Sequence, residues 1–314
     1  MKFSIPTVCL GKQADRFATY RDDIAFEEKI ELASKIKGLE GVGVFYPTEA
    51  KDVDKLKTLC SKYRLKISEI IVDVFTSPKF KYGSFSNPSD EIREEAIRTV
   101  KEAMDVAEEL GCVVNPWPGQ DGHDYLFQAD YEQAWKRLIS GVKECAQHRP
   151  KVRLAVEYKI KEPRTHIMLG TVGASLYLCQ KVGMPNVGIT LDTGHCFMAG
   201  ENPAESSVLL GMENKLFNIH VNDNYGDWDW DLIPGTIFAA SQAEFLFWLK
   251  AMHYNDWILI DVFPQRMDPL RTFDRAIRNM KRIEQAIDKT GIGKIKEKIG
   301  KGDIFETFNL LEEI

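Results

Sequence analysis

The stretch VGITLDTGH, residues 187–195, contains the pattern that decides the fold of this 314-residue chain. Its first five residues form a short apolar run of the kind that makes a buried strand. Asp192 follows at once, and a short helical stretch at residues 203–210 precedes the next apolar run. An apolar strand, a polar strand end and a helix therefore make one unit, which the chain repeats.

Apolar runs and amphipathic stretches alternate on both sides of this unit. The runs that we interpret as strands lie at residues 3–9, 41–45, 66–74, 112–117, 153–158, 187–191, 216–221 and 257–262. The stretches that we interpret as helices lie at residues 26–37, 50–63, 90–110, 131–148, 167–182, 203–210, 242–252 and 270–287. Eight such strand–helix units predict a parallel (β/α)8 barrel, a TIM barrel.

A doubly wound open sheet is the alternative architecture. The first strand–helix turn has no GxGxxG motif, which weakens this alternative only a little, because many open-sheet proteins lack the motif. The sequence contains no linker that would separate two globular domains. We therefore expect one barrel domain at residues 1–290 and a C-terminal helical tail at residues 291–314.

Composition and charge exclude several other classes of protein. Hydrophobic residues make up 44% of the chain and charged residues 28%, which excludes disordered and collagen-like chains. The net charge of -6 disfavours general nucleic-acid binding, which needs a basic surface. We see no signal-peptide pattern, and no apolar run approaches the roughly 18 residues that span a bilayer. Six scattered cysteines without a CxxC pair fit reduced thiols, so we expect a cytoplasmic protein without membrane partners.

Four consecutive strands in the second half of the chain carry an ionisable side chain at or near their carboxyl end. These residues are Glu157, Asp192, His220 and Asp261. Strands of a parallel barrel are buried on both faces, so a charge there must be paired, coordinated or functional. Barrel enzymes place their active sites at the carboxyl ends of the strands, and adjacent strands lie only about 5 Å apart. The four side chains are therefore predicted to converge.

Three carboxylates and one imidazole suit a divalent cation. Mn²⁺, Mg²⁺ and Co²⁺ accept oxygen-rich sites, and a cation would remove the repulsion among the carboxylates. The alternative is that each residue is a lone buried group bonded to the backbone or to a nearby Lys or Arg. Lys159 lies two positions after Glu157, on the same side of an extended segment, and His195 lies three positions after Asp192.

Two loops rich in aromatic and polar residues are predicted on the same face. The segment HVNDNYGDWDWDL at residues 220–232 interleaves aspartates with two tryptophans, and WPGQDGHDY occupies residues 117–125. Exposed indole rings suit stacking on a sugar. The candidate substrate-binding residues are Trp117, His123, Asp229 and Trp230. The alternatives are a solvated acidic turn in the later segment and a hydrogen-bonded turn histidine in the earlier one.

These motifs, with VEYKIKEPR, LDTGHCFMAG and IDVFPQRMDP, resemble those of the xylose-isomerase-like TIM-barrel superfamily of sugar isomerases and epimerases. The resemblance covers about residues 1–285. In L-rhamnose-isomerase-like members, the matching positions bind the divalent metal, which implies that role for Glu157, Asp192, His220 and Asp261. Ketose 3-epimerases typically have glutamate at the last position, so Asp261 favours the L-rhamnose-isomerase-like branch.

The same resemblance implies roles for the surrounding residues. Lys159 and His195 would contact substrate or a second metal, and Asp229 with Asp231 would complete that second site. The loop spacing differs from the family pattern, and ordering an acidic loop around a weakly held ion costs entropy. We therefore expect a single metal ion.

The function that the resemblance implies is a divalent-metal-dependent sugar isomerase or epimerase. Proton abstraction next to a carbonyl would give a metal-stabilised enediolate, with Mn²⁺ as the expected ion and Mg²⁺ or Co²⁺ as alternatives. The catalytic residues would be Glu157, Lys159, His195 and Asp261. The alternative is a metal-dependent lyase that cleaves 3-keto-glycosides, including C-glycosides, by β-elimination, with or without a small partner subunit. An apurinic endonuclease is disfavoured because it needs more histidine ligands, and we expect a homo-oligomer that acts on a small sugar or glycoside.

Overall fold

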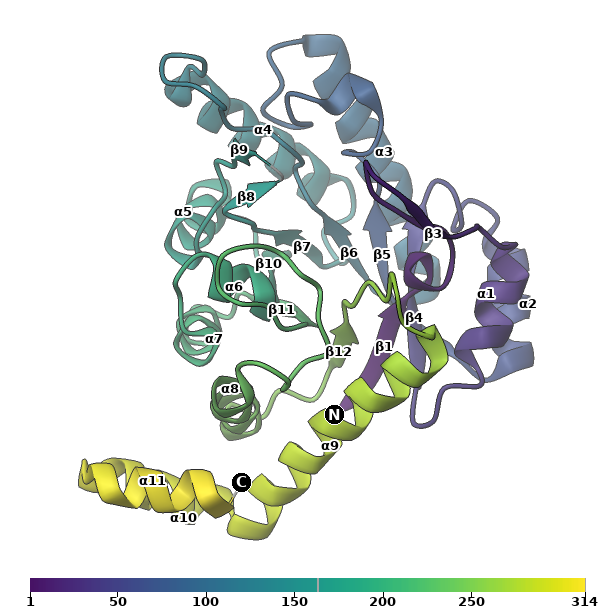
Figure 1. The fold of residues 1–314 in the computed structure, drawn as a ribbon. Coiled ribbons are helices and arrows are strands. Elements are labelled where there is room, and N and C mark those ends of the chain that lie inside the picture. Colours follow the sequence, from purple (N-terminus) through teal and green to yellow (C-terminus); the bar gives the residue numbers. More distant parts are fainter. Residues whose placement is uncertain (163, 314) are drawn as a thin grey trace.

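A closed barrel of eight parallel strands forms the centre of the computed structural model, which describes residues 1–162 and 164–313 (Figure 1). The barrel strands are β1 (Lys2–Pro6), β4 (Gly41–Tyr46), β5 (Lys66–Val72), β6 (Val113–Pro116), β7 (Leu154–Glu157), β10 (Val187–Asp192), β11 (Leu216–Val221) and β12 (Trp257–Ile260). Each lies beside the next barrel strand along the chain, and β1 closes the barrel against β12. The predicted (β/α)8 barrel is confirmed.

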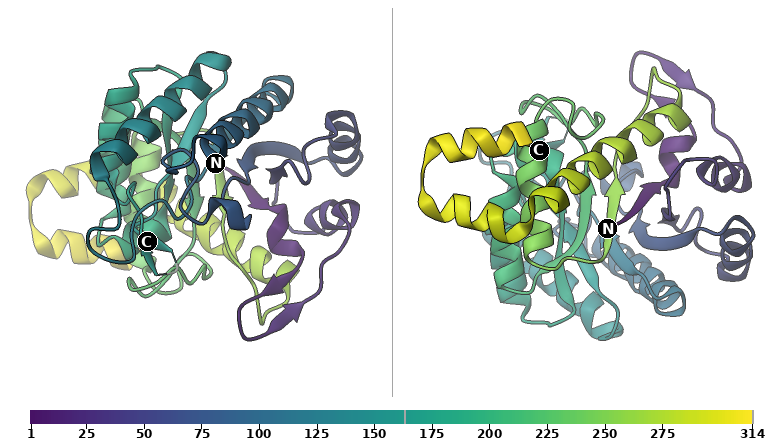
Figure 2. Two further views of the ribbon diagram at one scale, coloured as in Figure 1. Left: turned by 90° about the horizontal axis from the view of Figure 1, so that it is seen from above. Right: turned by 90° about the horizontal axis from the view of Figure 1, so that it is seen from below.

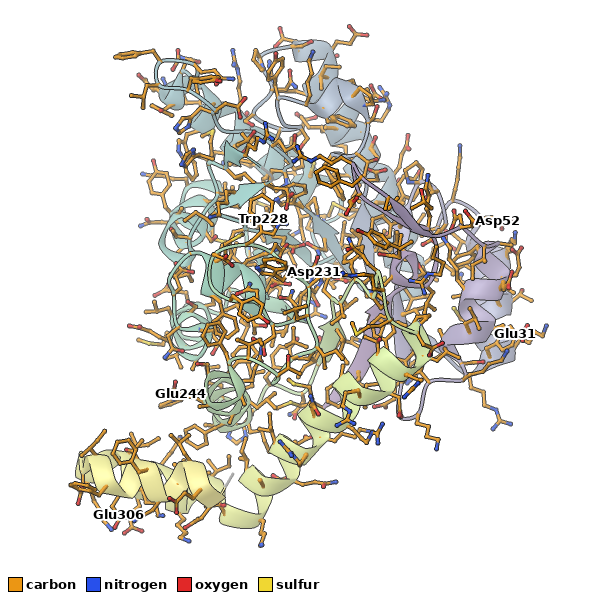
Figure 3. All side chains as sticks on the ribbon, in the orientation of Figure 1. Glu31, Asp52, Trp228, Asp231, Glu244 and Glu306 are labelled. Atoms are coloured by element: carbon orange, nitrogen blue, oxygen red, sulfur yellow. The ribbon has the colours of Figure 1, made fainter. Side chains whose placement is uncertain are left out.

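Helices surround the barrel on its outside (Figure 2), and exposed charged side chains such as Glu31 point outward from them (Figure 3). They are α1 (Phe26–Ala33), α2 (Val53–Tyr63), α3 (Asp90–Leu110), α4 (Tyr131–His148), α5 (Val172–Val182), α7 (Pro203–Met212), α8 (Ala239–Ala251) and α9 (Pro269–Thr290). The tail forms a pair of helices, α10 (Ile292–Lys301) and α11 (Ile304–Glu313), which extends from the body of the molecule beside α8. The tail is helical as predicted, and the domain division at residue 290 remains a prediction. Within the described ranges, no helix combines the length and the apolar character needed to cross a membrane.

Short elements lie between the main strands and helices. They are the hairpin of β2 (Gln13–Ala14) and β3 (Thr19–Arg21), the hairpin of β8 (Lys161–Glu162) and β9 (Thr165–His166), the 3-10 turns η1 (Thr7–Leu10) and η2 (Pro78–Phe80), and helix α6 (Thr193–Met198). The helix expected at residues 167–182 begins only at Val172, because the Thr171 hydroxyl accepts a hydrogen bond from the backbone N–H of Ala174 and caps the helix there.

Helix α6 was not expected from the sequence, and its start explains one site residue. The Asp192 carboxylate accepts a hydrogen bond from the backbone N–H of His195, which makes Asp192 the N-cap of α6. The cap turns the chain sharply at the end of β10, so that Asp192 and His195 both stay at the carboxyl end of the barrel. Strand pairing places Asp192 directly beside His220 of β11.

Candidate active site

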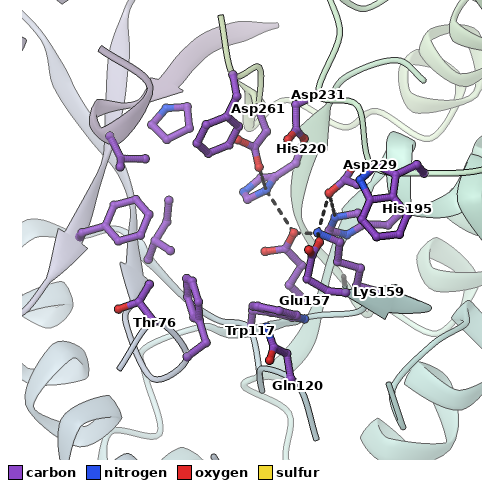
Figure 4. Close-up of a pocket in the computed structure, with 18 residues that line it drawn as sticks. Thr76, Trp117, Gln120, Glu157, Lys159, His195, His220, Asp229, Asp231 and Asp261 are labelled. Atoms are coloured by element: carbon purple, nitrogen blue, oxygen red, sulfur yellow. Dashed lines mark hydrogen bonds and ion pairs between the residues drawn. The ribbon is translucent and has the colours of Figure 1, made fainter. Parts of the chain in front are cut away.

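A cavity of about 560 Å³ opens at the carboxyl end of the barrel (Figure 4). We call one side of it the polar wall, which consists of Glu157, Lys159, Glu162, His195, His220, Asp229, Asp231 and Asp261. The side chains of Pro6, Val8, Phe45, Ile71, Phe75, Trp117 and Phe263, which we call the apolar wall, come mainly from β1, β4, β5, β6 and the loops that follow them. Thr76, Gln120 and Trp228 complete the lining.

The structure brings the four strand-end residues together. One ligand atom from each of Glu157, Asp192, His220 and Asp261 can be chosen so that all four lie within 4.8 Å of one another. The Nδ1 atom of His220 lies 3.6 Å from a carboxylate oxygen of Glu157, 3.6 Å from one of Asp261 and 4.0 Å from one of Asp192. In the described part of the chain, this quartet is the one such group of histidine, cysteine and acidic side chains.

The Nδ1 atom of His220 is the observation that fits a cation best. It is buried and has no hydrogen-bond partner, although three carboxylates face it. On the other side of the ring, Nε2 lies 2.9 Å from Oε1 of Glu69, which is fully buried. A carboxylate there accepts the Nε2 proton and directs Nδ1 at the quartet, where Nδ1 can release its proton and become a ligand, as in many metal-ligating histidines. The residues present therefore fit a divalent ion.

Amides hold two of the carboxylates in place. The Nδ2 atom of Asn115 donates to Glu157 at 3.0 Å, and that of Asn222 lies 3.0 Å from both oxygens of Asp192. Asn222 comes this close because residue 194 is glycine: a Cβ on Gly194 would lie 1.8 Å from the Asn222 side chain. These two neutral donors therefore order the Glu157 and Asp192 carboxylates before any ligand binds.

Burial and repulsion perturb the acidity of the quartet. Burial raises the pKa of Asp192 to about 6, and the carboxylates of Asp229, Asp261 and Glu157 add to this effect against the opposing charge of His195. Burial alone would raise the pKa of Glu157, but His220, His195 and Asn115 lower it to about 2. The carboxylates of Glu69 and Glu157 overcome burial and raise the pKa of His220 well above its ordinary value. Positive charge is therefore strongly favoured at this point.

A second group of charges lies beside the quartet. The ammonium group of Lys159 contacts Asp229 at 2.6 Å and Glu162 at 2.5 Å, and it lies 5.5 Å from the ring of Trp117. The Nε2 atom of His195 lies 3.3 Å from the same Asp229 oxygen. Burial would lower the pKa of Lys159, but Asp229 and Glu162 raise it well above its ordinary value. Lys159 is therefore a charged donor directed into the cavity, on the same side as Glu157.

Asp229 and Asp231, which the resemblance implies as ligands of a second metal, are arranged differently from the quartet. Asp229 is paired with the Lys159 ammonium and faces His195, so cationic side chains already neutralise it. Burial raises the pKa of Asp231 well above its ordinary value, and the neighbouring Asp229 and Asp261 raise it further. This arrangement is consistent with the expectation of one ion, which remains a prediction.

The aspartates of the loop at residues 220–232 have different contacts and different roles. The Asp223 carboxylate accepts hydrogen bonds from the backbone N–H groups of Thr236, Ile237 and Phe238 and so orders the entry to α8. Asp227 is exposed and accepts a hydrogen bond from the Trp230 indole. Asp229 and Asp231 line the cavity.

Two of the four candidate substrate-binding residues lie away from the cavity lining. Trp230 is 48% exposed and packs edge-on against Tyr225, and Trp228 lines the cavity in its place. His123 stacks on His166 at 5.0 Å and pairs with it through the backbone. Trp117 and Asp229 do line the cavity, and the Trp117 indole nitrogen is buried without a partner.

Several residues that support the site were missed in the sequence. They are Glu69, Asn115, Glu162, Asn218 and Asn222, which hold His220, Glu157, Lys159, Glu69 and Asp192 respectively. Glu69 gives the clearest signal, because it is a charged residue inside the apolar strand KISEIIV. A charged residue inside a buried strand must be paired, coordinated or functional, just as at a strand end, and this argument also indicates Glu69.

Comparison with known proteins gives a family and a fold. A family model described as the xylose isomerase-like TIM barrel matches residues 30–286. The xylose isomerase of Thermus thermophilus is 29% identical over 185 residues, which are 56% of this chain and 48% of that protein. The chain thus matches about half of the length of this curated relative.

Solved structures of similar fold cover almost the whole chain. A D-tagatose 3-epimerase-like protein has a TM-score of 0.71 at 19% identity and covers 92% of this chain and 99% of its own. The 3-keto-D-glucoside 4-epimerase of E. coli has a TM-score of 0.68 at 14% identity, and the match covers 90% of this chain and 99% of that protein. The D-allulose 3-epimerase of Methylomonas sp. has a TM-score of 0.68 at 16% identity, and the match covers 90% of this chain and 96% of that protein. At these identities the likeness establishes the fold alone.

Proposed function

The chain belongs to the xylose isomerase-like TIM-barrel family, and from this premise we propose that it is a divalent-metal-dependent sugar isomerase or epimerase. The unpartnered Nδ1 atom of His220, which faces three carboxylates, is the observation that carries the proposal. Mn²⁺ is the ion we expect, and Mg²⁺ or Co²⁺ suits the same mixture of oxygen and imidazole ligands. Placement in the L-rhamnose-isomerase-like branch remains a prediction.

The quartet would hold the ion, and its outer members would also move the proton. A bound divalent ion stabilises the negative charge that develops on substrate oxygens when the neighbouring carbon loses a proton. Glu157 on β7 and Asp261 after β12 flank the quartet, with β10 and β11 between their strands. A substrate between the two carboxylates would give its proton to one of them. Return from the opposite carboxylate inverts the carbon, whereas return to the adjacent carbon isomerises the sugar.

Lys159 and His195 would act as donors rather than as bases. The Lys159 ammonium stays protonated because Asp229 and Glu162 raise its pKa, so it can donate a hydrogen bond to a substrate oxygen. Burial would lower the pKa of His195, but Asp192 and Asp229 raise it to about 9. Both groups would stabilise an anionic intermediate from the polar wall of the cavity.

A lyase that acts on 3-keto-glycosides is the second candidate, and the apolar wall is the observation that favours it. The same proton abstraction next to a carbonyl would expel a leaving group two carbons away. An apolar leaving group would find complementary side chains in this cavity. The two candidates share the quartet and differ in the bond that breaks, so they can be separated by their products.

The test combines metal titration with isotopic labelling. Calorimetric titration of the metal-free protein with Mn²⁺ should give one tight site, which Asp192→Asn should lose. Reaction of free ketoses and of 3-keto-glucosides in deuterated water should place deuterium next to the carbonyl of the product, as proton transfer requires. A product without deuterium, formed with two ions bound per chain, would show a hydride shift and contradict the proposal.

A further inference from the structure

The last helix of the tail, α11, carries a stripe of exposed apolar side chains. Ile304, Phe308 and Leu311 follow one another at helical spacing, and Phe305 lies beside them on the same helix. Their side chains are between 45% and 70% exposed, whereas Leu310 on the opposite side of the helix is buried. We call the four exposed residues the tail stripe.

The tail stripe is held in place by the packing of the tail. Lys298 of α10 pairs with Glu306 and Glu313 of α11, and Ile295 of α10 is buried. Helix α10 also contacts α8 and α9, although the helix pair extends from the body of the molecule (Figures 1 and 2). The family model ends at residue 286, so the stripe lies outside the region that the family model matches.

A groove of about 240 Å³ lies beside the tail stripe, between α8, α10 and α11. Its apolar lining consists of Ala243, Phe247, Ile295, Ile299, Leu310 and Leu311. Pockets that enclose small ligands usually measure about 300–1,000 Å³, so this groove suits inserted side chains better than a small molecule. Leu311 belongs to both the groove and the tail stripe, so projecting rings and an apolar recess lie side by side on one face.

From this arrangement we propose that the tail stripe is the interface through which two copies of this chain form a dimer. Across a two-fold axis perpendicular to α11, Phe305 and Phe308 of each copy would enter the groove of the other. The two α11 helices would then be antiparallel. Glu312 near the end of one helix would lie close to Lys301 of the second copy and to the positive end of that copy's α11, so the charges are complementary.

The exposed apolar area is sufficient for a small dimer. At roughly 200 Å² for a fully exposed residue of this size, the tail stripe and Ile299 expose about 500 Å² in each copy. Two copies would together bury about 1,000 Å², which is the lower end of specific interfaces. A second copy is the partner that fits best, because the same face supplies both the projecting rings and the recess that receives them.

Sedimentation equilibrium of the full-length protein tests the proposal. The wild type should have at least twice the mass of one chain at micromolar concentrations. Phe308→Asp should raise the dissociation constant of the dimer at least about 100-fold, because a two-fold interface loses two buried rings and gains two buried charges. A monomeric wild type, or a Phe308→Asp protein that associates as tightly as the wild type, would overturn the proposal.

Phe127→Asp is the matched control, since Phe127 is fully exposed on a loop outside the tail. This variant should associate like the wild type, and its dissociation would place the interface elsewhere and overturn the proposal. Leu311→Asp replaces Phe308→Asp if circular dichroism shows that the latter is unfolded, and a folded Leu311→Asp protein should dissociate in the same way. Unchanged association of that protein would also overturn the proposal.

The proposal goes beyond the proposed function and does not rest on it. No residue of the tail lines the cavity at the end of the barrel, so Phe308→Asp should bind Mn²⁺ with the affinity of the wild type. A variant that dissociates and also loses affinity for Mn²⁺ would overturn the proposal, because its damage would reach beyond the tail. The mass is also measured on the metal-free protein, so failure of the metal titration would leave the dimer test decisive.

Discussion

Replacement of Glu69 by glutamine should weaken metal binding although Glu69 is not a ligand. The Glu69 carboxylate faces two donors, the Nε2 atom of His220 at 2.9 Å and the Nδ2 atom of Asn218. Glutamine has only one acceptor oxygen, so its amide N–H₂ would face one of these donors. His220 would lose either its fixed orientation or the electron density that a charged partner supplies.

The size of this effect follows from what such supporting carboxylates contribute elsewhere. Loss of a partner of this kind typically costs 10- to 100-fold in metal affinity, which corresponds to about 1.4–2.7 kcal/mol. One buried donor left without a partner should also lower the free energy of unfolding by about 1–3 kcal/mol. Both quantities are measurable on the purified protein, by calorimetric titration with Mn²⁺ and by urea denaturation.

Glu201→Gln is the matched control. The Glu201 carboxylate also accepts two hydrogen bonds, from the Tyr158 hydroxyl and from the backbone N–H of Val172, but it does not contact the quartet. This variant should lose stability to a similar extent and keep its affinity for Mn²⁺. A Glu69→Gln protein whose dissociation constant stays within about twofold of the wild type would refute the reasoning, as would an equal loss of affinity in Glu201→Gln.

Three further predictions follow from the site and its surroundings. Asp192→Asn should lose most bound Mn²⁺ by elemental analysis and keep its circular dichroism spectrum, since an amide oxygen still caps α6. Lys159→Met should lower kcat at least about 100-fold with the Mn²⁺ content unchanged, and an unaltered kcat would exclude Lys159 from catalysis. Burial raises the pKa of Asp121 from 3.8 to about 6, so the folded state binds the extra proton and stability falls as pH rises from about 4 to 6. Asp121→Asn should remove this loss of up to about 3 kcal/mol, which denaturation at pH 4 and pH 7.5 would detect.

The barrel could be predicted from the sequence because its strands are buried on both faces. Such strands appear as short apolar runs, and each of the eight runs overlaps a strand of the barrel. The residues at which helices begin were harder to predict from the sequence. Ser89 occupies the N-cap position of α3, but its side chain makes no capping hydrogen bond. The apolar pattern extends from residue 167, but the hydrogen bond from the Ala174 N–H to the Thr171 hydroxyl caps α5 and makes the helix begin later.

The quartet could be predicted as a group because parallel strands end at the same edge. The orientation of loop side chains could not be predicted, because it depends on contacts between segments that are distant in the sequence. Trp228 rather than Trp230 reaches the cavity because the loop is fixed by Asp223 and by the left-handed backbone of Asp231. His123 lies outside the cavity lining because it pairs with His166, a partner 43 residues later that no local pattern indicates.

The separation of the cavity into two walls has a consequence for how such an enzyme can change. Randomising Phe45, Ile71 and Phe75 alters strands and loops that supply none of the four proposed ligands. Substitutions at sites that share no partners usually have additive effects. A directed-evolution library confined to these positions should therefore sample new substrate preferences while most of its members still bind the ion. By the same reasoning, a duplicated gene can diverge at these wall positions and keep its reactive groups, provided that Glu69 and Asn115, which hold His220 and Glu157, are retained.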